Sequence, residues 1–411
     1  MSSKPTPATP ALDEPHSKKQ LLWLIAVLVF VCMNLRPMLT GLGPVLDSVR
    51  QSLQLSNTAV GLLITLPVLC FGLIAPIAPK LLPYFSAERL VTLGMIIQVI
   101  GIALRSLFGA PGLFIGTLVG GIGIGIVMVV LPGLIKQHFP TKASLMMGVY
   151  STALCLGATI SAALAVPLEE LPGSSWRWSL AFWLVPATVS IVAWWRINRN
   201  TPQTAASVRS ASALPKLSRN WLAWHITLYM GTQSTIAYCV FGWLPVILID
   251  RGLSPLNAGF ALSLLMLVQI VTSLTAPWMA QHGRDQRGVI AGLSILMWVG
   301  ILGLFFAPIG QVWLHATVAG LGLGGIFAMS LAFLVLRSPN AQVAAALSGM
   351  AQGVGYTIAA TGPFLVGWLH EVTDSWNSVA IFFMVLMSVA TCFGLSAGRN
   401  LTIKLPEPRK S

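Results

Sequence analysis

Twelve long apolar runs occupy most of this 411-residue chain and restrict how it can fold. A helix of about 20 apolar residues crosses a bilayer whose hydrocarbon core is about 30 Å thick. Runs of about this length lie at residues 21–45, 57–79, 88–107, 112–135, 144–167, 177–195, 222–247, 257–279, 289–307, 311–336, 344–369 and 377–397. We therefore predict an all-α membrane protein with twelve membrane-spanning helices.

The low content of charged residues supports a membrane-embedded chain. Asp, Glu, Lys and Arg make up 9% of the residues, whereas soluble domains contain about 25%. The formal net charge is +13, but the basic residues lie at the ends of the runs, which is typical of topology signals and not of a nucleic-acid surface. The five cysteines lie inside apolar runs without a metal-binding spacing. We predict no metal, no other cofactor and no nucleic-acid partner.

Lysine and arginine are distributed unequally between the two ends of the runs. One set of loops, together with the two chain ends, holds 19 of these residues, and the opposite loops hold four. The four are Arg50, Arg105, Arg177 and Arg251. Because cytoplasmic loops carry the excess of positive charge, we predict a multi-pass protein of the bacterial inner (plasma) membrane with both termini in the cytoplasm.

The chain is predicted to consist of two related halves. Matching residues recur at an offset of 201, for example Pro44 with Pro245 and Gly121 with Gly322. We expect a disordered cytoplasmic tail at 1–20, a six-helix half at 21–196, a cytoplasmic linker at 197–220, a second six-helix half at 221–397 and a cytoplasmic tail at 398–411. Halves with an even number of spans are parallel, so a solute would bind between them near the middle of the membrane.

Arg36 is the residue that most directly suggests a function. It lies about 15 residues into the first run, and no acidic residue occurs at a similar depth in any run. An arginine at the centre of a membrane helix costs about 2.5–3.5 kcal/mol on insertion scales. Because a guanidinium offers a planar fork of donors, we predict that it binds an anionic or strongly accepting solute. Backbone carbonyls are the alternative partners. Thr40 is expected on the same helix face.

Proline and glycine predict a loosened helix after Arg36. Pro37 has no N–H group and frees the carbonyl of Met33, and a loosened helix is tolerated in a membrane where it faces protein or a water-filled cavity. Glycines in the fourth and tenth runs are predicted to permit close helix packing and not to bind a dinucleotide, because no strand precedes them. The predicted hinge and packing residues are Pro37, Gly43, Pro44, Gly121, Gly123, Gly125, Gly322 and Gly324.

Few other polar side chains fall within the runs. Gln352 and Tyr356 are spaced four residues apart and share a helix face. The predicted solute-binding residues are Arg36, Thr40, Gln233, Tyr238, Gln352 and Tyr356. Interhelical hydrogen bonding is the alternative role for these side chains. Gln98 and Gln269 are predicted to make structural hydrogen bonds only.

Several segments resemble one known family. They are Asn34-Leu35-Arg36-Pro37, Leu66-Pro67, Gly121-Ile122-Gly123-Ile124-Gly125, Leu131-Pro132-Gly133-Leu134-Ile135-Lys136, Gly242-Trp243-Leu244-Pro245, Asp285-Gln286-Arg287-Gly288 and Ala345-Ala346-Leu347-Ser348-Gly349-Met350-Ala351-Gln352. With these segments the chain resembles, over nearly all of residues 20–400, the cyanate/2-nitroimidazole permease family of the major facilitator superfamily. The last two segments are closer to the 2-nitroimidazole branch. The loop from Ala75 to Lys80 departs from the superfamily because it lacks the usual Asp-Arg pair.

The resemblance implies a major facilitator fold of twelve helices in two six-helix halves. It also implies a secondary active or facilitated transporter that moves a small anion or small polar nitrogen-containing solute, cyanate-like or 2-nitroimidazole-like, by alternating access. Arg36 would lie in the central site, and a monomer would be sufficient. A broad-specificity efflux transporter of the same fold is the alternative, although the runs lack the buried carboxylate that binds cationic solutes. An enzyme is not expected, because the runs contain no nucleophile–base set.

Overall fold

The computed structural model describes residues 18–82, 84–139, 143–200, 217–281, 285–339 and 341–403, and in these residues every regular element is a helix. The elements are α1 (Lys18–Met33), α2 (Pro37–Thr40), η1 (Gly43–Val45), α3 (Leu46–Leu53), α4 (Asn57–Ile74), α5 (Ala78–Leu81), α6 (Ala87–Leu107), α7 (Gly109–His138), α8 (Ala143–Glu169), α9 (Trp176–Ala181), α10 (Leu184–Asn200), η2 (Leu217–Arg219), α11 (Trp221–Asp250), α12 (Pro255–Gln281), α13 (Arg287–Phe306), η3 (Ile309–Gln311), α14 (Val312–Leu336), α15 (Ala341–Thr373) and α16 (Trp376–Ala397). Most of the predicted tails and linker lies outside the described residues.

The described helices confirm the predicted fold class. Eleven of them are long and apolar enough to cross a membrane. The 33-residue α15 is not among these eleven, but it coincides with the run at 344–369 and supplies the twelfth span. Many large apolar side chains are exposed on the outer surface, including those of Leu73, Ile100 and Ile295. In water such exposure would be unfavourable, whereas a bilayer accommodates it.

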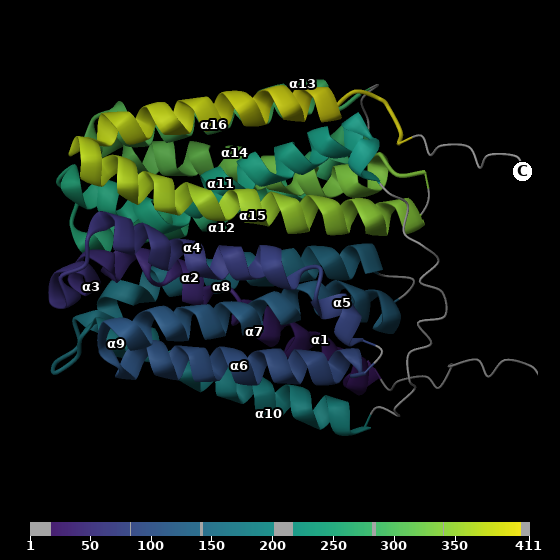
Figure 1. Ribbon diagram of the computed structural model, residues 1–411, viewed down its shortest axis with the longest axis horizontal. Helices are drawn as coiled ribbons and strands as arrows, with labels where there is room; N and C mark the ends of the chain where they lie inside the picture. The colour runs from purple at the N-terminus through teal and green to yellow at the C-terminus, as the bar shows by residue number, and fades with distance from the viewer. Residues whose placement is uncertain are drawn as a thin grey trace, which may run out of the picture.

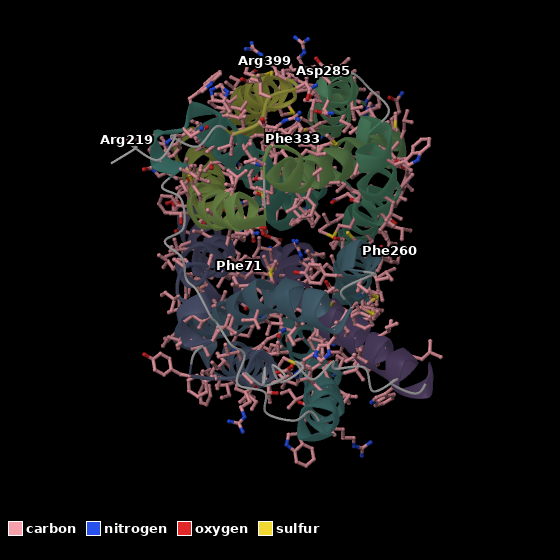
Figure 2. All side chains as sticks on the ribbon, turned by 90° about the vertical axis from the view of Figure 1, so that its right-hand side faces the viewer. Phe71, Arg219, Phe260, Asp285, Phe333 and Arg399 are labelled. Atoms are coloured by element: carbon pink, nitrogen blue, oxygen red, sulfur yellow. The ribbon has the colours of Figure 1, made fainter. Side chains whose placement is uncertain are left out.

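The helices form two groups that lie side by side. In Figure 1 the helices from α1 to α10 lie together in the lower part of the view, and those from α11 to α16 lie above them. Figure 2 looks at the bundle from the end that carries Arg219, Asp285 and Arg399, called here the Arg399 end. The other end, with the loops at Gly252 and Asp374, is called the Gly252 end. The main contacts between the two groups join α4 to α15 and α8 to α12.

The first predicted span is broken near its middle. Helix α1 ends at Met33, Pro37 is the first residue of α2, and Arg36 lies in the turn between them. Because proline has no N–H group and its ring crowds the preceding turn, α1 cannot continue through it. Gly157 of α8 packs against the exposed end of α1, where an added Cβ would collide with the carbonyl oxygen of Met33. The predicted first span at 21–45 therefore coincides with one candidate span, Leu22–Leu53, and the predicted loosening is a break of its helix before Pro37.

The packing of the glycine-rich helices corrects the register of the repeat. Gly121 of α7 lies against Pro67 and Cys70 of α4, whereas Gly322, its match at an offset of 201, lies against Met297 of α13. Gly320, two residues before Gly322, lies against Leu265 of α12. It therefore occupies in the second half the position that Gly121 occupies against α4 in the first. The offset of 201, which rests on residue identity alone, therefore pairs two glycines that pack against different helices of their halves. The predicted packing glycines Gly123, Gly125 and Gly324 also contact neighbouring helices.

Candidate functional site

A cavity lies between the two groups of helices, near the break in the first span. It encloses about 600 Å³ of empty space, including its open side. Its lining residues are Arg36, Ser151, Leu154, Cys155, Ala158, Gln233, Ser234, Ala237, Tyr238, Phe241, Met266, Gln269, Leu323 and Phe327. Both groups of helices contribute, so a molecule held there would contact both.

Among the described residues of this lining, Arg36 is the only one with a charged side chain. It is half-buried, and among the described residues no acidic group lies within ion-pair distance of its guanidinium. The guanidinium carbon lies 6.0 Å from the centre of the Phe241 ring, and Tyr238 lines the same cavity. The charge therefore faces the cavity with aromatic rings and hydroxyls as neighbours, and it is not neutralised by a carboxylate.

Side chains of α6 hold the broken backbone on both sides of Arg36. The amide nitrogen of Gln98 donates to the carbonyl oxygen of Asn34 over 2.5 Å, and Nη1 of Arg105 donates to the carbonyl oxygen of Met38 over 3.0 Å. Gln98 thus makes the structural hydrogen bond that was expected. Arg105, which was expected in an outer loop, is instead 2% exposed, and its Nε and Nη2 have no partner. Breaking a helix in an apolar interior leaves carbonyls that need donors.

An aromatic cluster surrounds the side of the cavity next to Arg36. The ring of Tyr238 lies 6.4 Å from that of Phe71, 6.3 Å from that of Tyr356 and 6.0 Å from that of Phe241, measured between centroids. Edge-to-face and tilted contacts at these distances are favourable. Tyr356 is buried in this cluster, but it does not line the cavity.

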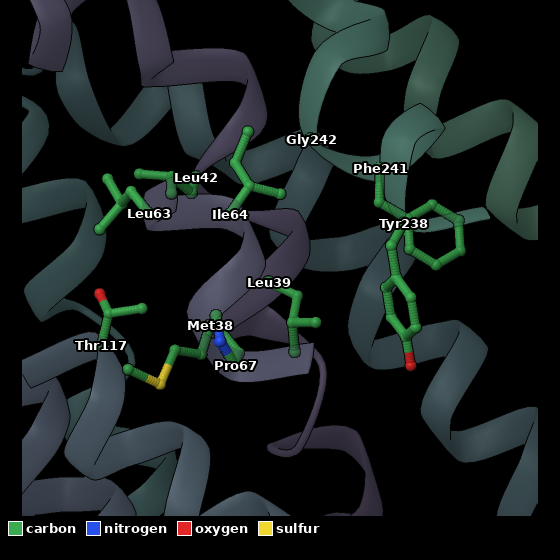
Figure 3. Close-up of a pocket in the computed structure, with 10 residues that line it drawn as sticks. All are labelled: Met38, Leu39, Leu42, Leu63, Ile64, Pro67, Thr117, Tyr238, Phe241 and Gly242. Atoms are coloured by element: carbon green, nitrogen blue, oxygen red, sulfur yellow. The ribbon is translucent and has the colours of Figure 1, made fainter. Parts of the chain in front are cut away.

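A second, smaller pocket adjoins the cavity toward the Gly252 end. Figure 3 shows its lining, which consists of Met38, Leu39, Leu42, Leu63, Ile64, Pro67, Thr117, Tyr238, Phe241 and Gly242. It encloses about 300 Å³, counted in the same way as the cavity. Tyr238 and Phe241 line both spaces and form the wall between them. The hydroxyl of Thr117 is buried there without a hydrogen-bond partner.

The structure separates the predicted solute-binding residues into two sets. Arg36, Gln233 and Tyr238 line the cavity. Thr40 does not: its hydroxyl lies 2.6 Å from the Ser161 hydroxyl and contacts the Ala158 carbonyl, both on α8. The amide of Gln352 donates to Ser348 one turn earlier on its own helix, and Gln352 also lies outside the lining.

One cavity residue was assigned the wrong role by the sequence. Gln269 of α12 was expected to make a structural hydrogen bond, but it lines the cavity and its amide nitrogen has no partner. Ser151 and Ser234 also line the cavity and were not predicted. The sequence feature that could have pointed to Gln269 is its position in the middle of an apolar run, which it shares with Gln233. Only the rotation of each helix decides which of such residues faces inward.

Comparison with known proteins agrees with this architecture. Residues 22–360 match the family described as Major Facilitator Superfamily. The chain belongs to the major facilitator superfamily. It is 36% identical to the 2-nitroimidazole transporter of Escherichia coli (strain K12), with 94% of this chain and 98% of that protein covered. It is 32% identical to the cyanate transport protein CynX of the same strain, with 90% and 97% covered.

A solved structure shares the fold of this major facilitator protein at low sequence identity. The crystal structure of a bacterial homolog to the human lysosomal transporter Spinster, in an inward-facing and occupied conformation, superposes with a TM-score of 0.74. The sequences are 14% identical, and the alignment covers 93% of this chain and 94% of that one. The chain is thus a multi-pass membrane transporter of small solutes and not an enzyme.

Proposed function

We propose that this protein carries a small anion or a small polar nitrogen-containing solute across the bacterial inner membrane by alternating access, with Arg36 as the principal binding group. The observation that carries the proposal is the half-buried guanidinium that lines the cavity without a described acidic partner. A guanidinium presents parallel N–H donors that match the two oxygens of a carboxylate or nitro group. The free-energy cost of removing this charge from water is offset when a solute with such acceptors binds.

The names of the relatives support the same class of solute. One relative is named for 2-nitroimidazole and another for cyanate. Both compounds are small, and both present electronegative atoms that can accept from a guanidinium. A cation, in contrast, would be repelled by Arg36, and no acidic side chain occurs among the lining residues to attract it. This favours the proposed solute class over broad efflux of cationic compounds.

The contacts between the halves support alternating access with this cavity closed toward the Gly252 end. There the backbone N–H of Thr58 on α4 donates to the Glu371 carboxylate on α15 over 2.7 Å. At the same end an added Cβ on Gly43 would lie 2.7 Å from the Phe241 carbonyl oxygen, so η1 and α11 are in close contact. Rocking of two rigid halves about a central site would break these contacts and open the cavity to the other side. With both termini cytoplasmic, the cavity as described is closed to the outside.

Solute flux into proteoliposomes tests the proposal. We would reconstitute the wild type, Arg36→Gln and Arg36→Lys, with Arg89→Gln as a control because Arg89 is exposed at the start of α6. Labelled cyanate and labelled 2-nitroimidazole would be supplied in parallel, and folding would be checked by size-exclusion chromatography and thermal melting. We expect flux of at least one solute in the wild type and the control, strong loss in Arg36→Gln and partial activity in Arg36→Lys.

Two results would contradict the proposal. Flux that survives in Arg36→Gln would assign the guanidinium a structural role. Absence of flux for both solutes in folded wild-type protein would show that the solute class is wrong.

A further inference from the structure

Gln269 presents an unused hydrogen-bonding group on the wall formed by the second half. Its side chain is 8% exposed and lines the cavity, and its amide nitrogen makes no hydrogen bond to any described residue. A buried donor without a partner is unfavourable, and such groups in native proteins usually have a ligand, an ion or a water as partner. Gln269 lies on α12, whereas Arg36 lies on the first half, so the two groups reach the cavity from different halves.

The other glutamine of the cavity is in a different state. The amide nitrogen of Gln233 donates to the hydroxyl of Ser234 over 2.7 Å and contacts the Met230 carbonyl at 3.2 Å. The same nitrogen also lies 3.5 Å from the Ser330 hydroxyl of α14, so its donors are used within the protein. The contrast identifies Gln269 as the cavity glutamine whose amide nitrogen has no partner among the described residues.

Helix packing holds Gln269 in this position. Gly324 of α14 lies directly against its backbone, and a Cβ added at Gly324 would be 2.6 Å from the Cα and 2.8 Å from the Cβ of Gln269. No side chain other than hydrogen fits there without moving α12 away from α14. The close contact thus fixes where the glutamine side chain starts, on the side of α12 that lines the cavity.

We infer that the transported solute carries two separate acceptor groups, one bound by Arg36 and the other by the amide of Gln269. The inference rests on the proposed function and narrows its solute class. The rest of the lining includes apolar side chains such as Leu154, Met266 and Phe327. The fitting solute is a small flat ring with a nitro or carboxylate group at one edge and an accepting ring atom at another. A triatomic anion would occupy the Arg36 end alone.

A matched pair of solutes tests the second contact. 2-Nitropyrrole keeps the nitro group, the five-membered ring and the ring N–H of 2-nitroimidazole, but it has carbon in place of the accepting ring nitrogen. Binding of both compounds to purified full-length protein would be measured by isothermal titration calorimetry for the wild type, Gln269→Met and Gln51→Met. Methionine is close to glutamine in size and cannot donate a hydrogen bond. Gln51→Met is the control because Gln51 is exposed on α3 and does not line the cavity.

One pattern of affinities supports the inference. The wild type is expected to bind 2-nitroimidazole about three- to tenfold more tightly than 2-nitropyrrole, which is the ratio that one net hydrogen bond gives. This preference disappears in Gln269→Met and persists in Gln51→Met. Equal wild-type affinities, or a preference that survives in Gln269→Met, would overturn the role of Gln269 while leaving the proposed function intact. Absence of binding of either compound to folded wild type would overturn both.

Discussion

The side-chain amide of Gln98 donates to the backbone carbonyl of Asn34 over 2.5 Å, two residues before the arginine that faces the cavity. The side-chain amide of Asn34 in turn donates to the Ser190 hydroxyl over 2.9 Å. The unwound segment is therefore attached to α6 and α10 of the same half. It does not move freely between the halves. This attachment explains how a broken helix can hold a charged side chain in a defined place.

Replacing Gln98 tests this attachment. In Gln98→Leu the Asn34 carbonyl loses its donor in a buried environment, and we expect a loss of about 1–3 kcal/mol of stability. Thermal melting of the purified protein would measure the loss, and flux should fall because Arg36 is less well positioned. Gln51→Leu serves as the control, since Gln51 is exposed on α3. A melting temperature equal to that of the wild type would contradict the attachment.

Tyr238 and Tyr356 provide a matched comparison of two phenols near Arg36. Only Tyr238 lines the cavity, whereas both rings pack in the same aromatic cluster. Tyr238→Phe keeps the ring and removes the hydroxyl next to Arg36, so we expect the KM for transport to change by about two- to tenfold. Tyr356→Phe should leave KM nearly unchanged. Kinetics of labelled solute uptake would separate the two, and equal effects would mean that both hydroxyls reach the solute.

Thr40 was predicted to bind solute, but its contacts point to helix packing. Its hydroxyl is fully buried and lies 2.6 Å from the Ser161 hydroxyl. Thr40→Val is nearly isosteric and removes this hydrogen bond, which should cost about 1 kcal/mol of stability. The KM of the folded fraction should remain at the wild-type value. A large rise in KM with unchanged stability would restore the original prediction.

The Glu371–Thr58 contact is expected to hold the Gly252 end closed. In Glu371→Ala the N-terminus of α4 loses a carboxylate partner from the other half, so the population open at this end should rise. Cys155 lines the cavity and reports the opening directly, because a membrane-impermeant maleimide applied at the Gly252 end should label it faster in the variant. Glu371→Gln retains an acceptor and should lie closer to the wild type. Cys155→Ser controls for labelling of the exposed Cys392. Unchanged labelling would show that other contacts keep this end closed.

Hydropathy and local chemistry along the chain were sufficient to predict the helical architecture and to select one candidate site residue, Arg36. The length of each apolar run depends only on consecutive residues, so the helices and their order followed from it. The break at Pro37 and the choice of Arg36 as a candidate binding residue also follow from local rules, since a proline interrupts a helix and a charge inside an apolar run needs a partner.

The remaining site residues were decided by how the helices rotate and pack against one another. Gln233 and Gln269 look alike within their runs, yet the amide of one is bonded to its neighbour Ser234 and that of the other is unpartnered on the cavity wall. Thr40 shares a short helix with the residues that follow Arg36, but its hydroxyl faces α8. Helices that are apolar all round carry almost no periodic signal for their inward face, because lipid and protein interior are both apolar. The direction in which each polar side chain points is therefore determined only by tertiary contacts, such as the packing of Gly324 against Gln269.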